Sequence, residues 1–207
     1  MSAGKFISLE GGEGVGKSTQ ARLLAARLRE RGIDVVETRE PGGSPGAEEI
    51  RRLLLDPAQS WGSRAEALLF AAARADHVEK VIRPALDAGR WVLCDRFVHS
   101  SLAYQGGALG LGFEAIDALH AFGSDGLLPD QVILLRAGAE VAAERLRARD
   151  GDRADRIGGR DEAFHARVRD GFVALAARDP DRIATVDATG TPEAVAARVW
   201  EQVGPLL

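Results

Sequence analysis

The amino-acid sequence predicts an α/β fold in which a five-stranded parallel sheet, flanked by helices, is the middle of three layers. Two observations predict this architecture. Five short apolar runs, partly β-branched, alternate with longer segments whose apolar residues recur at helical spacing. Such alternation favours a parallel sheet with right-handed crossovers and with helices on both faces.

The predicted strands are short apolar runs, which is typical of strands buried on both faces of a sheet. Helical spacing is clearest after the first run, where Ala21, Leu24 and Leu28 share one face. The five predicted strands cover residues 6–9, 33–36, 91–94, 131–135 and 183–186.

Glycine and proline positions predict where several helices end, bend or begin. Gly32 and Gly89 stand where helix-ending glycines belong. Pro84 predicts a bend in a long helix that starts near residue 64. Thr191 precedes a proline, which is typical of a helix N-cap followed by the first helical residue.

Length and composition fit one globular domain spanning residues 1–207. The chain is 45% hydrophobic and 28% charged, and its net charge of −4 argues against nucleic acid as a partner. No stretch resembles a signal peptide or a membrane span. Cys94 is the only cysteine, so a buried, inert thiol in a reducing, cytoplasmic setting is expected.

A glycine-rich motif follows the first predicted strand and precedes the first predicted helix. Residues 11–18 read G-x-x-x-x-G-K-S, and in this context the motif cradles phosphates with backbone N–H groups and a helix N-terminus. Lys17 would reach the β and γ phosphates, and Ser18 would place its hydroxyl on Mg²⁺. The predicted ATP-binding residues are Gly11, Gly12, Glu13, Gly14, Val15, Gly16, Lys17, Ser18 and Thr19.

Charged residues at the ends of two predicted strands indicate a second ligand beside the phosphates. Asp95 closes the third strand, where a carboxylate can bind Mg²⁺, although a helix cap is the alternative for an isolated aspartate. Arg39 and Arg96 leave the second and third strands at the same sheet edge. Two guanidinium groups there favour a nucleoside monophosphate acceptor over water, with surface salt bridges as the alternative for either arginine alone.

These motifs are similar to those of the thymidylate kinase family, and the resemblance covers nearly the whole chain. The shared segments are EGGEGVGKST at 10–19, TREPGG at 38–43, FAAAR at 70–74 and DRF-x-x-SS-x-AYQG at 95–106. The resemblance implies a three-layer P-loop NTPase fold, a homodimer, and Mg-ATP-dependent phosphorylation of dTMP to dTDP in dTTP biosynthesis. It also implies that the loop at 187–192 packs against adenine.

The resemblance further implies which residues bind dTMP. Phe70 would stack on thymine, Arg74 would donate to a thymine carbonyl, and Ser101 or Gln105 would help to read the base. Tyr104 would crowd the 2′ position and favour deoxyribose. From the residues alone, a core position for Phe70 and a half-buried one for Tyr104 are the alternatives. The predicted substrate-binding residues are Glu13, Arg39, Phe70, Arg74, Arg96, Ser101, Tyr104 and Gln105.

An arginine-rich segment of about residues 149–160 is expected to form a short lid, because its glycine and aspartate content should interrupt the preceding helix. Solvated surface arginines are the default interpretation of such a run. In bacterial members of the family, lid arginines close over ATP, and Gly14 leaves this phosphate loop without an arginine of its own. Arg149, Arg153 and Arg156 are therefore the lid candidates for catalysis.

The expected reaction is in-line attack by a dTMP phosphate oxygen on the γ phosphate of Mg-ATP. Lys17, Arg96 and the lid arginines would hold the developing charge, and the resemblance implies that Glu13 lies near the acceptor sugar and the metal. Two alternatives stay open: a kinase of the same fold with another small acceptor, and a nucleotide-dependent switch that controls a protein partner. The GTP form of the switch is disfavoured because the chain has no Asn-Lys-x-Asp motif.

Overall fold

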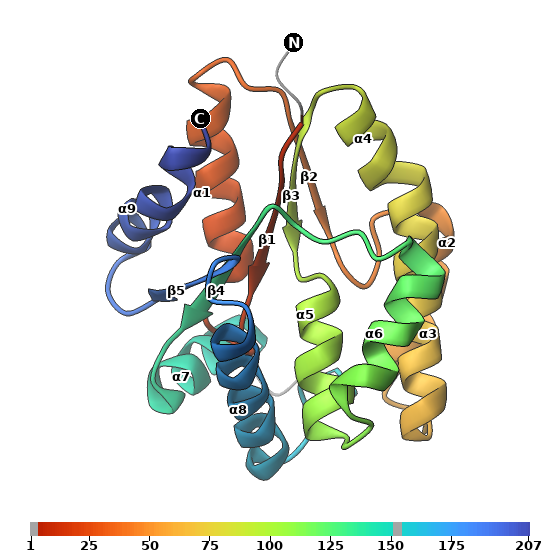
Figure 1. The fold of residues 1–207 in the computed structure, drawn as a ribbon. Coiled ribbons are helices and arrows are strands. Elements are labelled where there is room, and N and C mark those ends of the chain that lie inside the picture. The colour runs from red at the N-terminus through yellow and green to blue at the C-terminus, as the bar shows by residue number, and fades with distance from the viewer. Residues whose placement is uncertain (1–3, 151–154) are drawn as a thin grey trace.

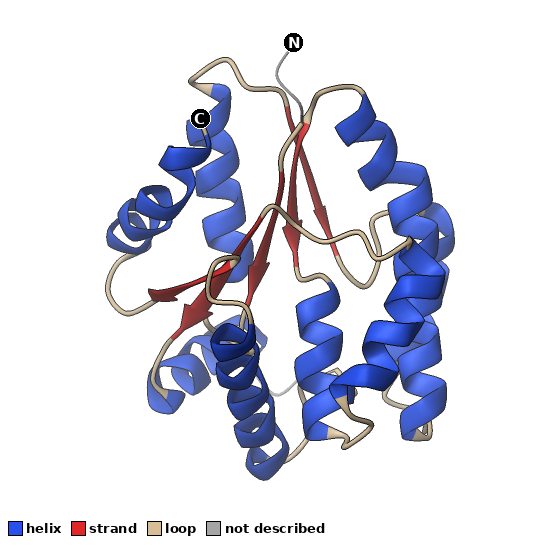
Figure 2. Ribbon diagram, in the orientation of Figure 1, coloured by secondary structure: helices blue, strands red, loops and turns tan. Residues whose placement is uncertain are grey.

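The computed structural model describes residues 4–150 and 155–207, without the side chains of residues 149 and 150. At its centre lies a sheet of five parallel strands in the order β2-β3-β1-β4-β5 (Figures 1 and 2). This arrangement confirms the predicted α/β fold. The strands are β1 (Phe6–Glu10), β2 (Val35–Arg39), β3 (Trp91–Asp95), β4 (Gln131–Arg136) and β5 (Ile183–Asp187).

Helices cover both faces of the sheet, with α1 and α9 side by side on one face and α3, α4, α5 and α6 on the other (Figure 1). The α-helices are α1 (Lys17–Arg29), α2 (Pro45–Leu55), α3 (Ser63–His77), α4 (Arg83–Asp87), α5 (Val98–Ser101), α6 (Phe113–Ser124), α7 (Ala139–Asp150), α8 (Glu162–Arg178) and α9 (Pro192–Val203). Shorter π-helical and 3₁₀ segments are η1 (Val78–Ile82), η2 (Leu102–Ala108) and η3 (Gly204–Leu206).

The two faces of the sheet carry separate apolar cores, because successive side chains of a strand point to opposite faces. In β1, Ile7 and Leu9 pack in the core that includes Leu24 of α1. Phe6 lies on the other face, where its ring meets the ring of Phe97 edge-on at 4.8 Å. All five side chains are at most 3% exposed, and each such burial stabilises the fold by roughly 1.5–3 kcal/mol.

Several helix boundaries follow the predicted signals. Gly32 and Gly89 have left-handed backbone angles, with φ of +78° and +74°. The Thr191 hydroxyl caps α9 by accepting from the backbone N–H of Ala194 at 3.3 Å. Pro84 lies in the first turn of α4, which continues α3 through the π-helical segment η1. The sequence predicts a bend at Pro84, and the structure places a π-helical segment just before this proline.

The strands and the arginine-rich segment differ from the predicted bounds in an informative way. β2 begins at Val35 rather than residue 33 and continues to Arg39, which pairs with Asp95 in the ladder. Backbone hydrogen bonds to β3 hold the polar residues that extend β2 to Arg39. The pattern of apolar residues in the sequence cannot reveal such bonds. α7 includes residues 149 and 150, because its alanine, leucine, arginine and glutamate content favours helix up to the glycine at 151. No helix among the described residues is long and apolar enough to cross a bilayer.

Candidate functional site

A cavity of about 680 Å³ lies at the carboxyl ends of β1, β2 and β3, the edge at which open α/β sheets bind ligands. β1 lies between β3 and β4, so the loop after β1 separates two groups of lining residues. One group comes from α3 and the helices after β3: Phe70, Arg74, Ser100, Ser101, Tyr104 and Gln105. The other comes from α7, α9 and the β5–α9 loop: Arg145, Leu146, Ala188, Gly190, Pro192 and Val195.

The loop between β1 and α1 curls through backbone angles that favour glycine. Gly11, Gly14 and Gly16 have φ of +135°, +74° and +94°. A Cβ on Gly14 would also collide with the carbonyl of Ala142 in α7. Residues 13–19 of the predicted phosphate loop line the cavity, and α1 begins at Lys17. This backbone can direct successive N–H groups at phosphate oxygens.

The Lys17 side chain folds back over the loop. Its Nζ donates to the carbonyls of Gly11 at 3.2 Å and Gly12 at 2.7 Å, and the residue is 7% exposed. Burial, and after it the charge of the nearby Arg96 guanidinium, lowers its pKa to about 8. Among the described residues its hydrogen bonds go to carbonyl oxygens, and the nearby Glu13, Asp95 and Glu10 charges only partly offset its burial. Anionic oxygens in the loop would therefore find a pre-positioned cation.

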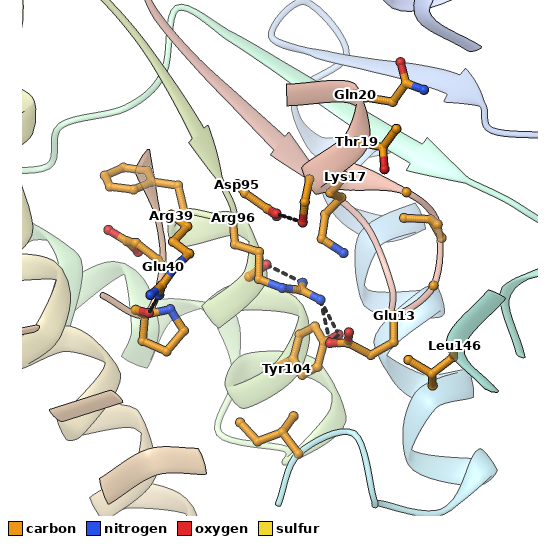
Figure 3. A pocket seen from close by; sticks show the side chains of 18 of the residues that line it. Glu13, Lys17, Thr19, Gln20, Arg39, Glu40, Asp95, Arg96, Tyr104 and Leu146 are labelled. Carbon is orange, nitrogen blue, oxygen red and sulfur yellow. Dashed lines mark hydrogen bonds and ion pairs between the residues drawn. The ribbon is translucent and has the colours of Figure 1, made fainter. Parts of the chain in front are cut away.

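Ser18 and Asp95 lie against each other and both line the cavity, and Figure 3 shows the Asp95 carboxylate beside the phosphate loop. The Ser18 hydroxyl donates to Asp95 Oδ2 at 2.5 Å. Among the described residues, no group of three or more His, Cys, Asp or Glu side chains gathers to bind a metal. A hydroxyl and one carboxylate suit a cation that takes its remaining ligands from phosphates and water.

Arg96 is the central cation of the cavity. Its backbone has φ of +71°, which is uncommon for a residue with a side chain. Its guanidinium donates to Gly11 O and Ser100 Oγ, both at 3.0 Å, and to Glu13 Oε1 at 2.6 Å (Figure 3). Burial alone would lower its pKa, but Tyr104 and neighbouring carboxylates raise it above the ordinary value. Arg96 is therefore held as a fixed positive charge.

A buried carboxyl group lies beneath this cation. Glu10, at the end of β1, is fully buried and accepts hydrogen bonds from the Phe97 backbone N–H at 2.7 Å and from Ser100 Oγ at 2.6 Å. Burial raises its pKa to about 7, although these hydrogen bonds and the Arg96 charge oppose the shift. Glu10 thus fixes the turn that leads from β3 into α5.

The predicted base-binding residues form one wall of the cavity. Arg74 is 3% exposed and donates to Glu40 Oε2 at 2.7 Å and to Ser101 Oγ at 2.8 Å. Phe70 is half-buried and lies one helical turn before Arg74 on α3. The Tyr104 hydroxyl donates to Glu13 at 3.2 Å. The structure therefore brings the predicted base, sugar and phosphate residues into one cavity.

Two further basic residues line the cavity, Arg39 at the end of β2 and Arg51 on α2. Arg39 donates to the Pro41 carbonyl at 3.0 Å and pairs with Glu48 at 3.0 Å. Arg51 donates to the same carbonyl at 2.7 Å and also lines the cavity. Burial, and after it the Arg39 charge, lowers the pKa of Arg51. Sequence reasoning missed Arg51 because it lies on a helix outside every motif.

Of the three predicted lid arginines, only Arg156 has a side chain that the structure describes. The Arg149 side chain and the whole of Arg153 lie outside the described residues. Arg156 donates through Nε to Leu54 O at 2.7 Å, and its guanidinium pairs with Glu66 at 2.8 Å. In this arrangement Arg156 is directed at α2 and α3. Arg145 instead lines the cavity and donates to Ala188 O at 2.9 Å.

Glu66 is an acidic residue that sequence reasoning missed. It lies in the first turn of α3 and pairs with both Arg156 and Arg160, at 2.8 and 2.5 Å. Its spacing from Phe70 and Arg74 is four and eight residues, which places all three on one helical face. That spacing is the signal that could have identified Glu66 from sequence.

Comparisons with known proteins agree on one family. The family model described as "Thymidylate kinase" matches residues 9–199. A thymidylate kinase of Rhizorhabdus wittichii is 62% identical over 205 residues, covering 99% of both chains. One from Nitrobacter winogradskyi is 49% identical, covering 95% of this chain and 86% of its own. The crystal structure of thymidylate kinase from Ehrlichia chaffeensis matches with a TM-score of 0.80 at 34% identity, covering 98% of this chain and 99% of its own.

Proposed function

This chain belongs to the thymidylate kinase family and phosphorylates dTMP to dTDP with ATP, and on that premise we propose how its residues hold both nucleotides. The observation that carries the proposal is the single cavity in which the phosphate loop separates two groups of lining residues. ATP lies with its adenine between α7 and the loop that follows β5, near Arg145 and Gly190. The base of dTMP lies on the opposite side of the loop, against Phe70 and Arg74.

Ser18 and Asp95 are the residues that would hold Mg²⁺ together with the triphosphate. Their hydroxyl and carboxylate oxygens suit this hard cation, which usually keeps several waters and takes phosphate oxygens as ligands. When bound, Mg²⁺ neutralises part of the phosphate charge. The hydrogen bond between Ser18 and Asp95, at 2.5 Å, keeps these two oxygens together before a metal arrives.

The reaction is an in-line displacement at the γ phosphorus. An oxygen of the dTMP phosphate forms a bond to phosphorus as the bond to the β–γ bridging oxygen breaks, leaving ADP. The second pKa of a phosphate monoester is about 6, so the attacking group is mostly dianionic at neutral pH and needs no strong base. Lys17 and Arg96 supply fixed positive charge at the site of transfer, which is the main demand of phosphoryl transfer.

Substrate recognition uses the wall built on α3 and the helices after β3. Phe70 stacks on thymine, Arg74 donates to a thymine carbonyl, and Ser101 and Gln105 read the remaining base edge. Tyr104 stands near the sugar, where its ring limits space at the 2′ position. Arg39, together with Arg51, draws the dTMP phosphate toward Arg96.

The lid arginines Arg149, Arg153 and Arg156 approach the transferred phosphoryl when both nucleotides are bound. Arg156 must first leave Glu66, with which it is paired at 2.8 Å. Closure would exclude water and limit ATP hydrolysis. The lid would thereby supply the positive charge that the phosphate loop, with Gly14 in place of an arginine, lacks.

A homodimer forms through α2, α3 and α6, which expose large apolar side chains. We also propose that the protein is cytoplasmic. Leu53, Leu68 and Phe122 are 45%, 56% and 93% exposed. A surface of this kind is typical of subunit contacts. Light scattering should give twice the chain mass for the wild type and a lower mass for Phe122→Glu; a monomeric wild type would contradict the dimer.

A coupled ADP-release assay with dTMP, dUMP, AMP, CMP and GMP tests the substrate assignment. Turnover should be fastest with dTMP and negligible with the purines, because the wall offers one aromatic face and donors matched to thymine carbonyls. Faster turnover with any purine nucleotide would contradict the proposed base site. Omitting Mg²⁺ in the presence of EDTA should abolish turnover, and undiminished activity would contradict the metal site.

A further inference from the structure

Glu66 is a fully buried carboxylate that three side chains approach. Its Oε1 accepts from the Gln105 amide nitrogen at 2.9 Å, and its Oε2 accepts from Arg160 at 2.5 Å. The Arg156 guanidinium lies 2.8 Å from the same Oε2. The exposed fraction of the Glu66 side chain is 0%, against 11% and 20% for the two arginines.

The cost of burying this charge is balanced by its partners. A carboxylate removed from water is tolerated when it is paired and hydrogen-bonded. Here Arg160 and Gln105 donate hydrogen bonds to Glu66, and Arg156 adds a second ion pair. Its partners come from distant parts of the chain: Gln105 from the helix after β3, and Arg156 and Arg160 from the segment before α8. Glu66 thus joins the base wall to the arginine-rich segment.

The chemistry of Glu66 dictates which end of the Gln105 amide faces it. A carboxylate that is paired with guanidinium groups offers only acceptors, so Gln105 must turn its NH₂ group toward Glu66. The amide is planar, and its oxygen therefore points away from Glu66. Gln105 is 1% exposed and lines the cavity, so its orientation matters to a base bound there.

We propose that Glu66 is a positioning residue for base selectivity, which orients Gln105 so that its amide oxygen accepts the N3–H of thymine. Thymine and uracil carry a donor at N3, whereas cytosine carries an acceptor there. An amide oxygen therefore favours the first two and leaves cytosine with two facing acceptors. The inference rests on the proposed base site and adds a residue that does not touch the base.

Glu66→Gln is the informative variant because it keeps the size of the side chain and changes its hydrogen-bonding pattern. The new amide at position 66 would keep its oxygen toward the arginines and turn its NH₂ group toward Gln105. The Gln105 amide would then rotate, so that its oxygen accepts from position 66 and its own NH₂ group faces the base. We expect the ratio of kcat/KM for dTMP to that for dCMP to fall roughly tenfold or more, the effect of one misdirected hydrogen bond. The ratio of dTMP to dUMP should stay constant, since both bases carry N3–H.

Two further variants separate orientation from structural damage. Exchanging the pair, Glu66→Gln with Gln105→Glu, restores an acceptor at position 105 and should restore the dTMP-to-dCMP ratio. Glu37→Gln is the matched control, because it breaks an ion pair with Arg29 at 2.6 Å on the sheet surface. It should change neither nucleotide ratio.

The outcomes distinguish this inference from the base site on which it rests. If Gln105→Met lowers the dTMP-to-dCMP ratio but Glu66→Gln leaves it unchanged, Glu66 does not position the amide and the inference fails. If neither variant changes the ratio, Gln105 does not read the base and the proposed base site fails. If Glu66→Gln does not fold, the exchanged pair decides, since an unrestored ratio in a folded double variant overturns the inference.

Discussion

The phosphate loop and the base wall belong to the same cavity but are held in place in different ways. In the loop, glycine geometry and the contacts of Lys17 with Gly11 and Gly12 act over at most six residues of sequence. In the wall, Arg74 is fixed by Glu40, which is 34 residues away. The loop also receives long-range hydrogen bonds from Arg96 to Gly11 O and Glu13, but its backbone shape is set locally, whereas the wall is positioned by contacts between distant parts of the chain.

This difference has energetic consequences. The loop can form wherever the strand before it and the helix after it are in place, so changes there should act on nucleotide binding and chemistry. The wall depends on buried carboxylates, and removing one partner leaves an uncompensated charge that costs about 3–5 kcal/mol. Changes in the wall should therefore act on stability and on acceptor selectivity together.

The largest effect is expected at Lys17 in the loop. Lys17→Ala should lower kcat roughly 10³-fold, because the charge that follows the transferred phosphoryl is lost. Thermal unfolding should change little, since the hydrogen bonds that the ammonium donates among the described residues go to carbonyl groups. Steady-state ADP release gives kcat, and the exposed Lys80→Ala is the control. An unchanged kcat would remove Lys17 from the reaction.

Next in size is a loss of stability at Glu40 in the wall. Glu40→Gln leaves the Arg74 guanidinium and the fully buried His77 without their shared carboxylate. We expect the free energy of unfolding in urea to fall by about 3 kcal/mol, with a higher KM for dTMP. The surface variant Glu37→Gln should change the free energy of unfolding by less than about 0.5 kcal/mol. Equal effects of the two variants would contradict the long-range account of the wall.

Glu10 lies close to both regions, and its burial predicts that the free energy of unfolding depends on pH. Its pKa rises from the ordinary 4.5 to about 7 on folding, chiefly through burial. Between pH 4.5 and 7 the folded state therefore binds more protons than the unfolded state. The stabilising contribution of Glu10 is complete below pH 4.5 and is lost as the pH rises to 7. As the pH rises from 4.5 to 8, the free energy of unfolding of Glu10→Gln, measured in urea, should increase relative to that of the wild type by up to about 3 kcal/mol. A difference that is constant over this range would contradict the shift.

The same contrast explains how much the sequence alone can predict. The alternation of strands and helices, the phosphate loop and Asp95 follow from local patterns, because each depends on neighbours in the chain. The family resemblance then predicts the cavity positions of Phe70 and Arg74. Arg51 escapes prediction, since its partners are fixed by tertiary packing and it lies in no recognisable motif. Glu66 is signalled only by its helical spacing from Phe70 and Arg74, and its partners too are fixed by tertiary packing.

The smallest effect is expected where one aromatic face meets the base. Phe70→Leu keeps apolar packing but removes the ring, so KM for dTMP should rise roughly tenfold, in line with about 1–3 kcal/mol for base stacking. Because kcat depends on groups at the phosphates, it should change less than KM. Phe70→Tyr keeps the ring and should retain most of the affinity. If Phe70→Leu folds normally and its KM for dTMP is unchanged, the base does not stack on α3, and selectivity must come from the hydrogen-bonding residues alone.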